Sequence, residues 1–204
     1  SAAVQGLPAE ERLLFDAQAG GRRRLTPREC ALGRAIAANV ATLAAAIDTE
    51  WAGLTEAVAG DEAAAREMVA RVTTDVLGEF ETLLDVKLAP VGKSPDTARP
   101  DGFEGRGSGT ERDAVRLPLD GAAALVAVMV DGREGGETIL ATLETARSIA
   151  GSLPPELGGL LDTPQRRARL ILLRDAIRAA RDVALDELPA LVGITVGFNS
   201  RDGD

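Results

Sequence analysis

An apolar side chain recurs at steps of three or four residues from Leu32 to Val58, and this period restricts the fold more than any other feature of the chain. Such spacing predicts one long helix, about 45 Å in length, with a continuous apolar face. Thr26, Pro27 and Glu29 form the pattern of a capping box with proline in the first turn, which places the start of the helix. The apolar positions are Leu32, Ile36, Val40, Leu43, Ile47, Trp51, Leu54 and Val58.

A second apolar stripe with the same period follows directly after Gly60 and Asp61. Two long stripes joined by one tight turn predict an antiparallel helical hairpin. We expect both stripes, including Trp51 and Phe80, to lie in the core. The second stripe comprises Met68, Val69, Val72, Val76, Phe80, Leu83, Leu84 and Leu88.

The remaining segments also predict helices, and no pair of segments is suited to form a sheet. We expect helices over residues 7–15, 137–153 and from Thr163 to Pro189, the last ended by Gly193. The apolar run 121–130 predicts a central buried helix that resumes after Pro118. Residues 91–117, rich in glycine and proline, predict a long loop. The expected fold is an all-α bundle of long antiparallel helices with this one loop, followed by a short extended piece at 194–196.

Charge and composition exclude several classes of function. A net charge of -9 disfavours nucleic acid as a partner. The longest uninterrupted apolar run is half of the roughly 20 residues that cross a bilayer, so we expect no transmembrane segment. Cys30 is the single cysteine, has no partner for a disulfide within the chain, and is expected to be a small buried side chain.

The absence of histidine is the most useful negative feature. It rules out a Ser-His-Asp or Cys-His arrangement and a histidine-based zinc site within this chain. A metal held by this chain alone would be a hard cation bound by oxygen atoms. The chain begins with Ser1 and shows no basic-then-apolar signal sequence, so we expect a processed or trimmed part of something longer.

Two irregular segments carry candidate site residues. The ending 197–204 joins an aromatic ring, two glycines and acidic groups, and its Asn199, Asp202 and Asp204 either bind a ligand or bond to their own backbone in a closing turn. The central loop holds Glu104, Arg106 and Ser108. Arginine is suited to bidentate binding of carboxylate or phosphate, and the alternative is a solvated loop.

Several segments together resemble the imelysin-like family. Gly6-Leu7-Pro8-Ala9-Glu10-Glu11 is similar to the Gly-x-His-x-x-Glu motif of that family, and 197–204 resembles the Gly-Phe-Asn-x-x-Asp-Gly-Asp ending of its predicted lipoproteins. The segment 30–39, Trp51 and the Glu-x-Arg-x-Ser segment 104–108 also look like that branch. The motif places Glu11 as a candidate ligand or metal-binding residue, but Pro8 stands at the histidine position, and proline coordinates nothing. The alternative for Glu11 is an acid that stabilises a helix N-terminus.

The resemblance implies a two-domain, all-helical protein of the bacterial envelope, periplasmic or lipid-anchored, that is linked to iron uptake. It divides the chain into residues 1–24, the end of an N-terminal helical domain plus linker, and residues 25–204, a C-terminal bundle. We expect a non-enzymatic protein that binds a metal ion such as iron, or a small ligand, where the domains meet, near Glu11, the central loop and the C-terminal turn; an envelope protein is a possible further partner. The alternatives are a metallopeptidase, as some relatives have been assigned, and a helical scaffold without a small-molecule site.

Overall fold

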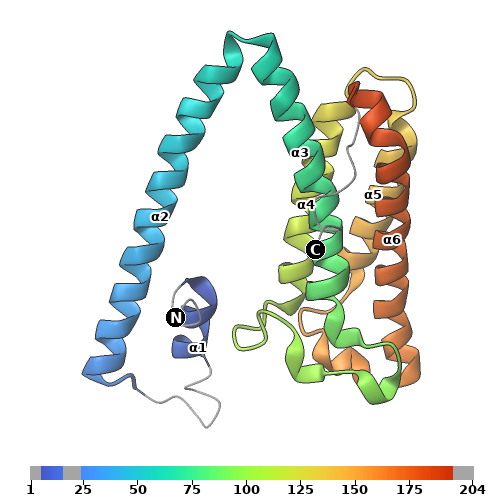
Figure 1. Ribbon diagram of the computed structural model, residues 1–204. Helices are drawn as coiled ribbons and strands as arrows, with labels where there is room; N and C mark the ends of the chain where they lie inside the picture. Colours follow the sequence, from blue (N-terminus) through green and yellow to red (C-terminus); the bar gives the residue numbers. More distant parts are fainter. Residues whose placement is uncertain (1–5, 16–23, 195–204) are drawn as a thin grey trace, which may run out of the picture. The chain divides into compact units, whose positions relative to one another are not determined.

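The computed structural model describes residues 6–15 and 24–194, and these form helices and turns without a strand. The expected all-α fold is therefore confirmed for this part of the chain. Figure 1 shows the helices α1 (Leu7–Leu14), α2 (Pro27–Ala59), α3 (Glu62–Thr82), α4 (Glu111–Val130), α5 (Gly136–Ser152) and α6 (Pro164–Val192). The C-terminal residues 197–204 lie outside the described residues.

The chain divides into two compact units. Unit 1 comprises Ser1–Ala64 together with Gly107–Gly109, and unit 2 comprises Ala65–Arg106 and Thr110–Asp204. The predicted boundary at residue 24 and the predicted pairing of the two long N-terminal helices stay predictions.

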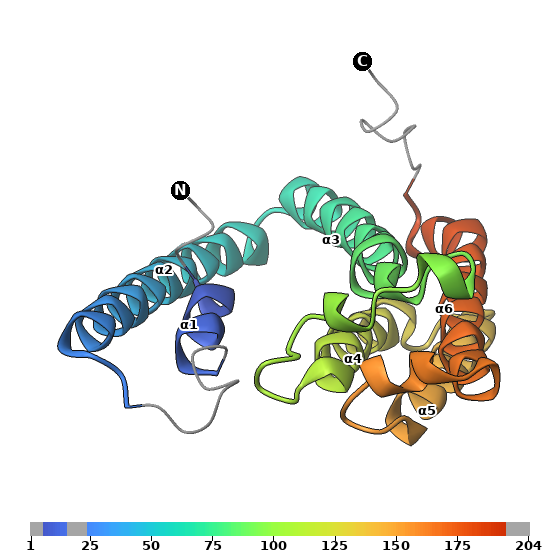
Figure 2. The same ribbon diagram turned by 90° about the horizontal axis from the view of Figure 1, so that it is seen from below.

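Unit 2 is a helical bundle with a continuous apolar core. Figure 2 looks along the bundle, in which α5 packs against both α4 and α6. The stripe expected on α6 is buried at each of its positions, which are Leu170, Leu173, Ile177, Ala180, Ala184 and Leu188. Val76 and Phe80 of α3 join this core, as expected for Phe80. Each large apolar side chain buried in this way stabilises the fold by roughly 1.5–3 kcal/mol.

The segment between α3 and α4 contains several short helical turns instead of one irregular loop. A π-helical turn, η3 (Leu83–Lys87), is followed by three 3-10 turns, η4 (Ala89–Val91), η5 (Pro95–Thr97) and η6 (Pro100–Gly102). The backbone of this segment is fixed by α6. Arg167 donates to the carbonyl oxygens of Val91 and Gly92 at 3.0–3.2 Å, and Arg174 donates to Gly92 O at 3.0 Å.

Helix α4 begins at Glu111, so the expectation that the loop runs to residue 117 and that the helix resumes after Pro118 is wrong. Pro118 lies inside the helix. Proline lacks one helical hydrogen bond, but burial of Val115 and Leu119 on either side of it favours a continuous helix. The expected central position of 121–130 is half right. One face of this segment is buried, while Leu125 and Val128 are 48% and 78% exposed.

In unit 1, the capping box predicted for α2 is present. The Thr26 hydroxyl accepts from the Glu29 backbone N–H, and the Glu29 carboxylate accepts from the Thr26 backbone N–H at 2.7 Å. Helix α1 packs against α2. At Gly33, a Cβ would lie 3.1 Å from the side chain of Leu13, so a small residue suits this close approach.

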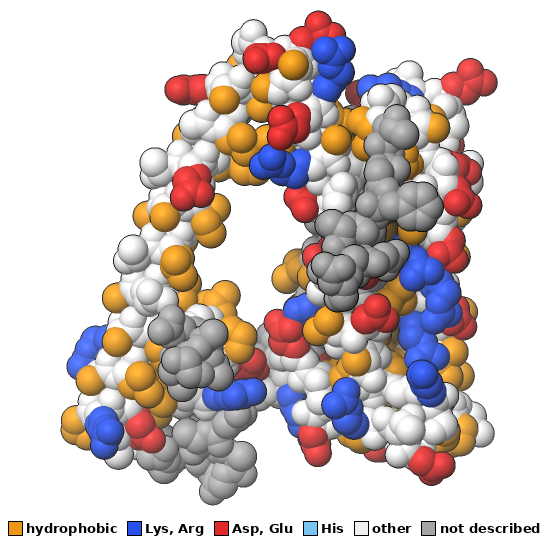
Figure 3. Space-filling view, in the orientation of Figure 1, with side chains coloured by type: hydrophobic (Ala, Val, Ile, Leu, Met, Phe, Trp, Pro, Cys, Tyr) orange, Lys and Arg blue, Asp and Glu red, His pale blue; other side chains and the backbone are white. Residues whose placement is uncertain are grey.

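The expectation that the apolar stripe of α2 is core is wrong for most of its length. Ile36 is its one buried residue, whereas Ile47 and Trp51 are 65% and 63% exposed. Figure 3 shows hydrophobic side chains along the surface of α2. The period of a stripe fixes which face is apolar, but not which element covers it.

Cys30, expected to be buried, is half-buried. By length and composition alone, α2 could also cross a membrane, a property that core helices of soluble proteins and signal sequences share.

Candidate functional site

Glu11 is positioned by the short helix α1. Gly6 precedes the helix with φ 92°, a conformation that glycine adopts readily, and Pro8 occupies the first turn. Glu10 lies in this first turn, where a negative charge is favourable. The Glu11 side chain lies one step further along and is half-buried.

Ser108 meets Glu11 although 97 residues separate them in the sequence. The backbone N–H of Ser108 donates to Glu11 Oε1 at 3.0 Å, and its hydroxyl donates to the same oxygen at 2.7 Å. Both groups belong to unit 1, in which Gly107–Gly109 is included. The structure thus brings together two residues that the sequence suggested as parts of one site.

A tight turn from Gly105 to Thr110 encloses Ser108 in the sequence and fixes the backbone on both sides of it. The N–H of Thr110 donates to Gly105 O at 2.8 Å, and Gly105 has φ 78°. A Cβ at this position would lie 2.5 Å from Oγ1 of Thr110 and 2.8 Å from its backbone carbon. Glycine is therefore required here for steric as well as conformational reasons.

Glu104 and Arg106 have partners within unit 2. Glu104 forms an ion pair with Lys87. Arg106 donates to the carbonyl oxygen of Pro100 at 3.0 Å and pairs with Asp101 at 2.7 Å. These contacts hold the loop, and the prediction that Glu104 and Arg106 bind a ligand stays a prediction.

Glu111 is a buried acid that the sequence reasoning did not single out. Its side chain is almost fully buried and accepts from the backbone N–H groups of Leu157 and Gly158 at 2.5 and 2.7 Å. The guanidinium of Arg106 lies 3.7 Å from its other oxygen. The sequence feature that could have indicated Glu111 is an acid directly after Thr110 at the start of a helix. The expectation of a loop up to residue 117 placed that helix start too late.

The described residues by themselves do not form a complete set of metal ligands. Within residues 6–15 and 24–194, no group of three or more His, Cys, Asp and Glu side chains is placed to hold a metal ion. Pro8 occupies the position at which the family motif has histidine. Of the other residues predicted to bind, Asn199, Asp202 and Asp204 lie outside the described residues.

The described residues form an all-helical chain in which Glu11 of α1 accepts two hydrogen bonds from Ser108. The family model described as Imelysin matches residues 1–184, and the chain belongs to the imelysin family. No match was found among curated proteins or among solved structures.

Proposed function

We propose that the chain is a non-enzymatic binding protein of the bacterial envelope, linked to iron uptake, whose binding position is centred on Glu11 and Ser108. The observation that carries the proposal is the pair of hydrogen bonds from Ser108 to Glu11 Oε1. They fix the orientation of a carboxylate that stands in the family motif. A carboxylate held in this way is pre-organised, and pre-organisation lowers the cost of binding.

The second oxygen of Glu11 supplies the chemistry. No hydrogen bond from another described residue reaches Oε2, while Oε1 takes both bonds from Ser108. An ionised carboxylate oxygen accepts from a donor group or binds a hard cation. The ligand class that fits is therefore a cation or a small molecule with a hydrogen-bond donor.

Binding is favoured over peptide hydrolysis by the donor set of the chain. A metallopeptidase requires a metal, an activated water and a general base. The sequence contains no histidine, and Pro8 removes the imidazole that would share a helix face with Glu11. Iron would need oxygen ligands in addition to Glu11, and Asn199, Asp202 and Asp204 are the proposed sources.

An envelope location, periplasmic or lipid-anchored, and an envelope protein as partner complete the proposal. Both rest on the likeness of the motifs in 6–11 and 197–204 to those of the family. They are tested separately from binding, by fractionation of cells that express the full-length protein.

The experiment compares Glu11→Gln and Ser108→Ala with the matched control Glu10→Gln. Glu10 is the neighbouring acid on α1, so the control changes the same charge on the same helix. The probes are iron(III) supplied as its citrate complex, measured by calorimetry and metal analysis, and insulin B chain for hydrolysis. We expect iron binding that falls at least about tenfold in Glu11→Gln, because a charge-assisted contact is lost, and is unchanged in Glu10→Gln.

Three results would contradict the proposal. They are the absence of iron binding by the unaltered protein, equal binding by Glu11→Gln, and hydrolysis of insulin B chain that both a chelator and Glu11→Gln abolish. The last result would establish the peptidase alternative. Asp202→Asn, measured in parallel, tests whether the C-terminal acids contribute.

A further inference from the structure

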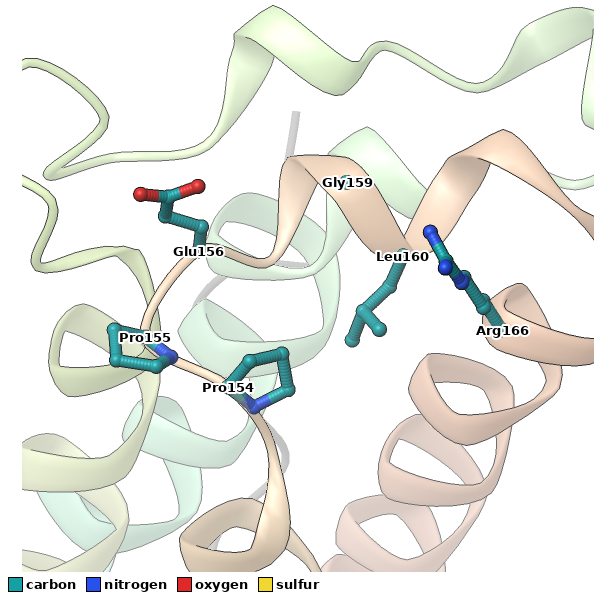
Figure 4. Close-up of a pocket in the computed structure, with 6 residues that line it drawn as sticks. All are labelled: Pro154, Pro155, Glu156, Gly159, Leu160 and Arg166. Atoms are coloured by element: carbon teal, nitrogen blue, oxygen red, sulfur yellow. The ribbon is translucent and has the colours of Figure 1, made fainter.

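We propose that unit 2 carries a second, separate binding site for a short apolar peptide with free termini, in the surface pocket between α5 and α6. The pocket has a volume of about 420 Å³ and is lined by Pro154, Pro155, Glu156, Gly159, Leu160 and Arg166. Figure 4 shows Leu160 between Pro154 and Arg166, with Glu156 and Arg166 at opposite ends of the group. This volume falls in the range of small-molecule sites, roughly 300–1,000 Å³.

The backbone of the segment that lines the pocket is fixed by hydrogen bonds from two arginines. Arg169 donates to Ser152 O at 2.7 Å, and Arg112 donates to Leu153 O at 3.3 Å through its side chain and to Pro155 O at 3.0 Å through its backbone N–H. The buried carboxylate of Glu111 accepts hydrogen bonds from the backbone N–H groups of Leu157 and Gly158. The segment is thus held in place before any ligand arrives, which reduces the ordering cost of binding.

The lining combines an apolar surface with two charges that are available to a ligand. The rings of Pro154 and Pro155 and the side chain of Leu160 provide the apolar part. Arg166 is 62% exposed and has one ion pair among the described residues, with Asp162 at the long distance of 4.0 Å. Glu156 is exposed and makes no hydrogen bond or ion pair with another described residue.

These features select one kind of ligand. Arg166 suits a terminal carboxylate, because guanidinium binds carboxylate through two parallel hydrogen bonds. Glu156 suits a terminal ammonium group, and the prolines and Leu160 suit apolar side chains between the two charges. A di- or tripeptide with apolar side chains carries these groups in this order. The site is distinct from Glu11 and Ser108, and its test does not depend on the function proposed for them.

Gly159 offers a direct way to close the pocket. A Cβ at Gly159 meets no atom within 4 Å, so a larger side chain enters open space and leaves the fold intact. Gly151 of α5 has the same open surroundings but does not line the pocket. Gly159→Leu and Gly151→Leu are therefore a matched pair that differ in whether the pocket is filled.

The experiment measures binding of the dipeptide Leu-Leu by calorimetry and by NMR shifts, with N-acetyl-Leu-Leu-amide as the uncharged comparison. We expect Leu-Leu to bind and the capped peptide to bind at least about tenfold more weakly. Gly159→Leu should abolish binding, and Arg166→Gln and Glu156→Gln should each weaken it by a similar factor. Gly151→Leu and Arg178→Gln should bind as the unaltered protein does. No binding of Leu-Leu at millimolar concentration, equal binding of the capped peptide, or undiminished binding by Gly159→Leu would overturn the proposal.

Discussion

Glu111 and Gly158 are joined by a buried hydrogen bond across 47 positions of sequence, in which the Gly158 N–H donates to the Glu111 carboxylate at 2.7 Å. The N–H of Leu157 donates to the same oxygen. This one side chain connects the start of α4 to the turn η7 (Gly158–Asp162). Because a buried N–H without a partner costs free energy, removal of the Glu111 carboxylate should destabilise unit 2.

We predict that Glu111→Ala lowers the free energy of unfolding by about 2–4 kcal/mol, since two backbone N–H groups lose their buried acceptor. Urea unfolding followed by far-ultraviolet circular dichroism measures the change. Glu156→Ala, which alters an exposed acid nearby, should stay within about 0.5 kcal/mol. Equal losses in the two variants would show that burial of Glu111 contributes nothing specific.

Gly158 and Gly159 should differ sharply although they are adjacent. A Cβ at Gly158 would lie 2.6 Å from Pro100 O and 2.8 Å from the Arg106 guanidinium, whereas one at Gly159 meets no atom within 4 Å. We expect Gly158→Ala to cost about 1–3 kcal/mol through overpacking, and Gly159→Ala to be near neutral. The comparison of urea midpoints decides, and a Gly158→Ala protein as stable as Gly159→Ala would refute the steric argument.

Arg167 should be essential for the order of the segment after α3. Its guanidinium donates to Val91 O and Gly92 O and is nearly buried. We predict that Arg167→Met destabilises unit 2 by about 2–3 kcal/mol, because two carbonyl groups lose a charged donor. Arg178→Met removes an exposed arginine of the same helix and should cost less than about 1 kcal/mol. Hydrogen exchange at residues 88–98 provides a local readout, and unchanged protection in Arg167→Met would contradict the prediction.

Asp113 should make stability fall at acid pH. The hydrogen bond from Arg116, with the nearby charge of Arg112, lowers the pKa of Asp113 below its ordinary value of 3.8, against the opposing effect of desolvation. Because the folded-state pKa is the lower one, the ionised carboxylate stabilises the fold above about pH 4, and this contribution is lost as the pH falls through the folded-state value. The melting temperature of Asp113→Asn should therefore lie below that of the unaltered protein at about pH 6, and the difference should shrink as the pH falls below 3.8. A constant difference over this range would exclude the linkage, and Asp162→Asn controls for a change of surface charge.

Local signals in the sequence were sufficient for α5 and α6 of unit 2 and for the start of α2. The helical period predicts the apolar face of α6, and each position of that face is buried in the structure. The capping box at Thr26 formed as predicted, because its contacts are made within one turn. The start of α4 could not be predicted in this way. A proline at position 118 indicates a boundary locally, but the anchoring of Glu111 by the turn near Gly158 is a long-range contact.

The candidate site was predictable in its residue types but not in its contacts. The motif suggested Glu11, and the loop suggested Ser108, but no local pattern indicates that their side chains meet. Trp51 shows the same limit of local patterns, because it was predicted to lie in the core and is exposed. A helical period states which residues share a face, and only the packing of other elements determines whether that face is covered.

Trp51 also determines how unfolding can be observed. It is the single tryptophan, and the chain has no tyrosine, so intrinsic fluorescence reports on α2 in unit 1. Its indole is already largely in contact with water in the folded protein. Loss of the core around Phe80 and Leu173 would therefore leave the emission spectrum nearly unchanged. A tryptophan introduced into α6 would be needed to follow the unfolding of unit 2 by fluorescence.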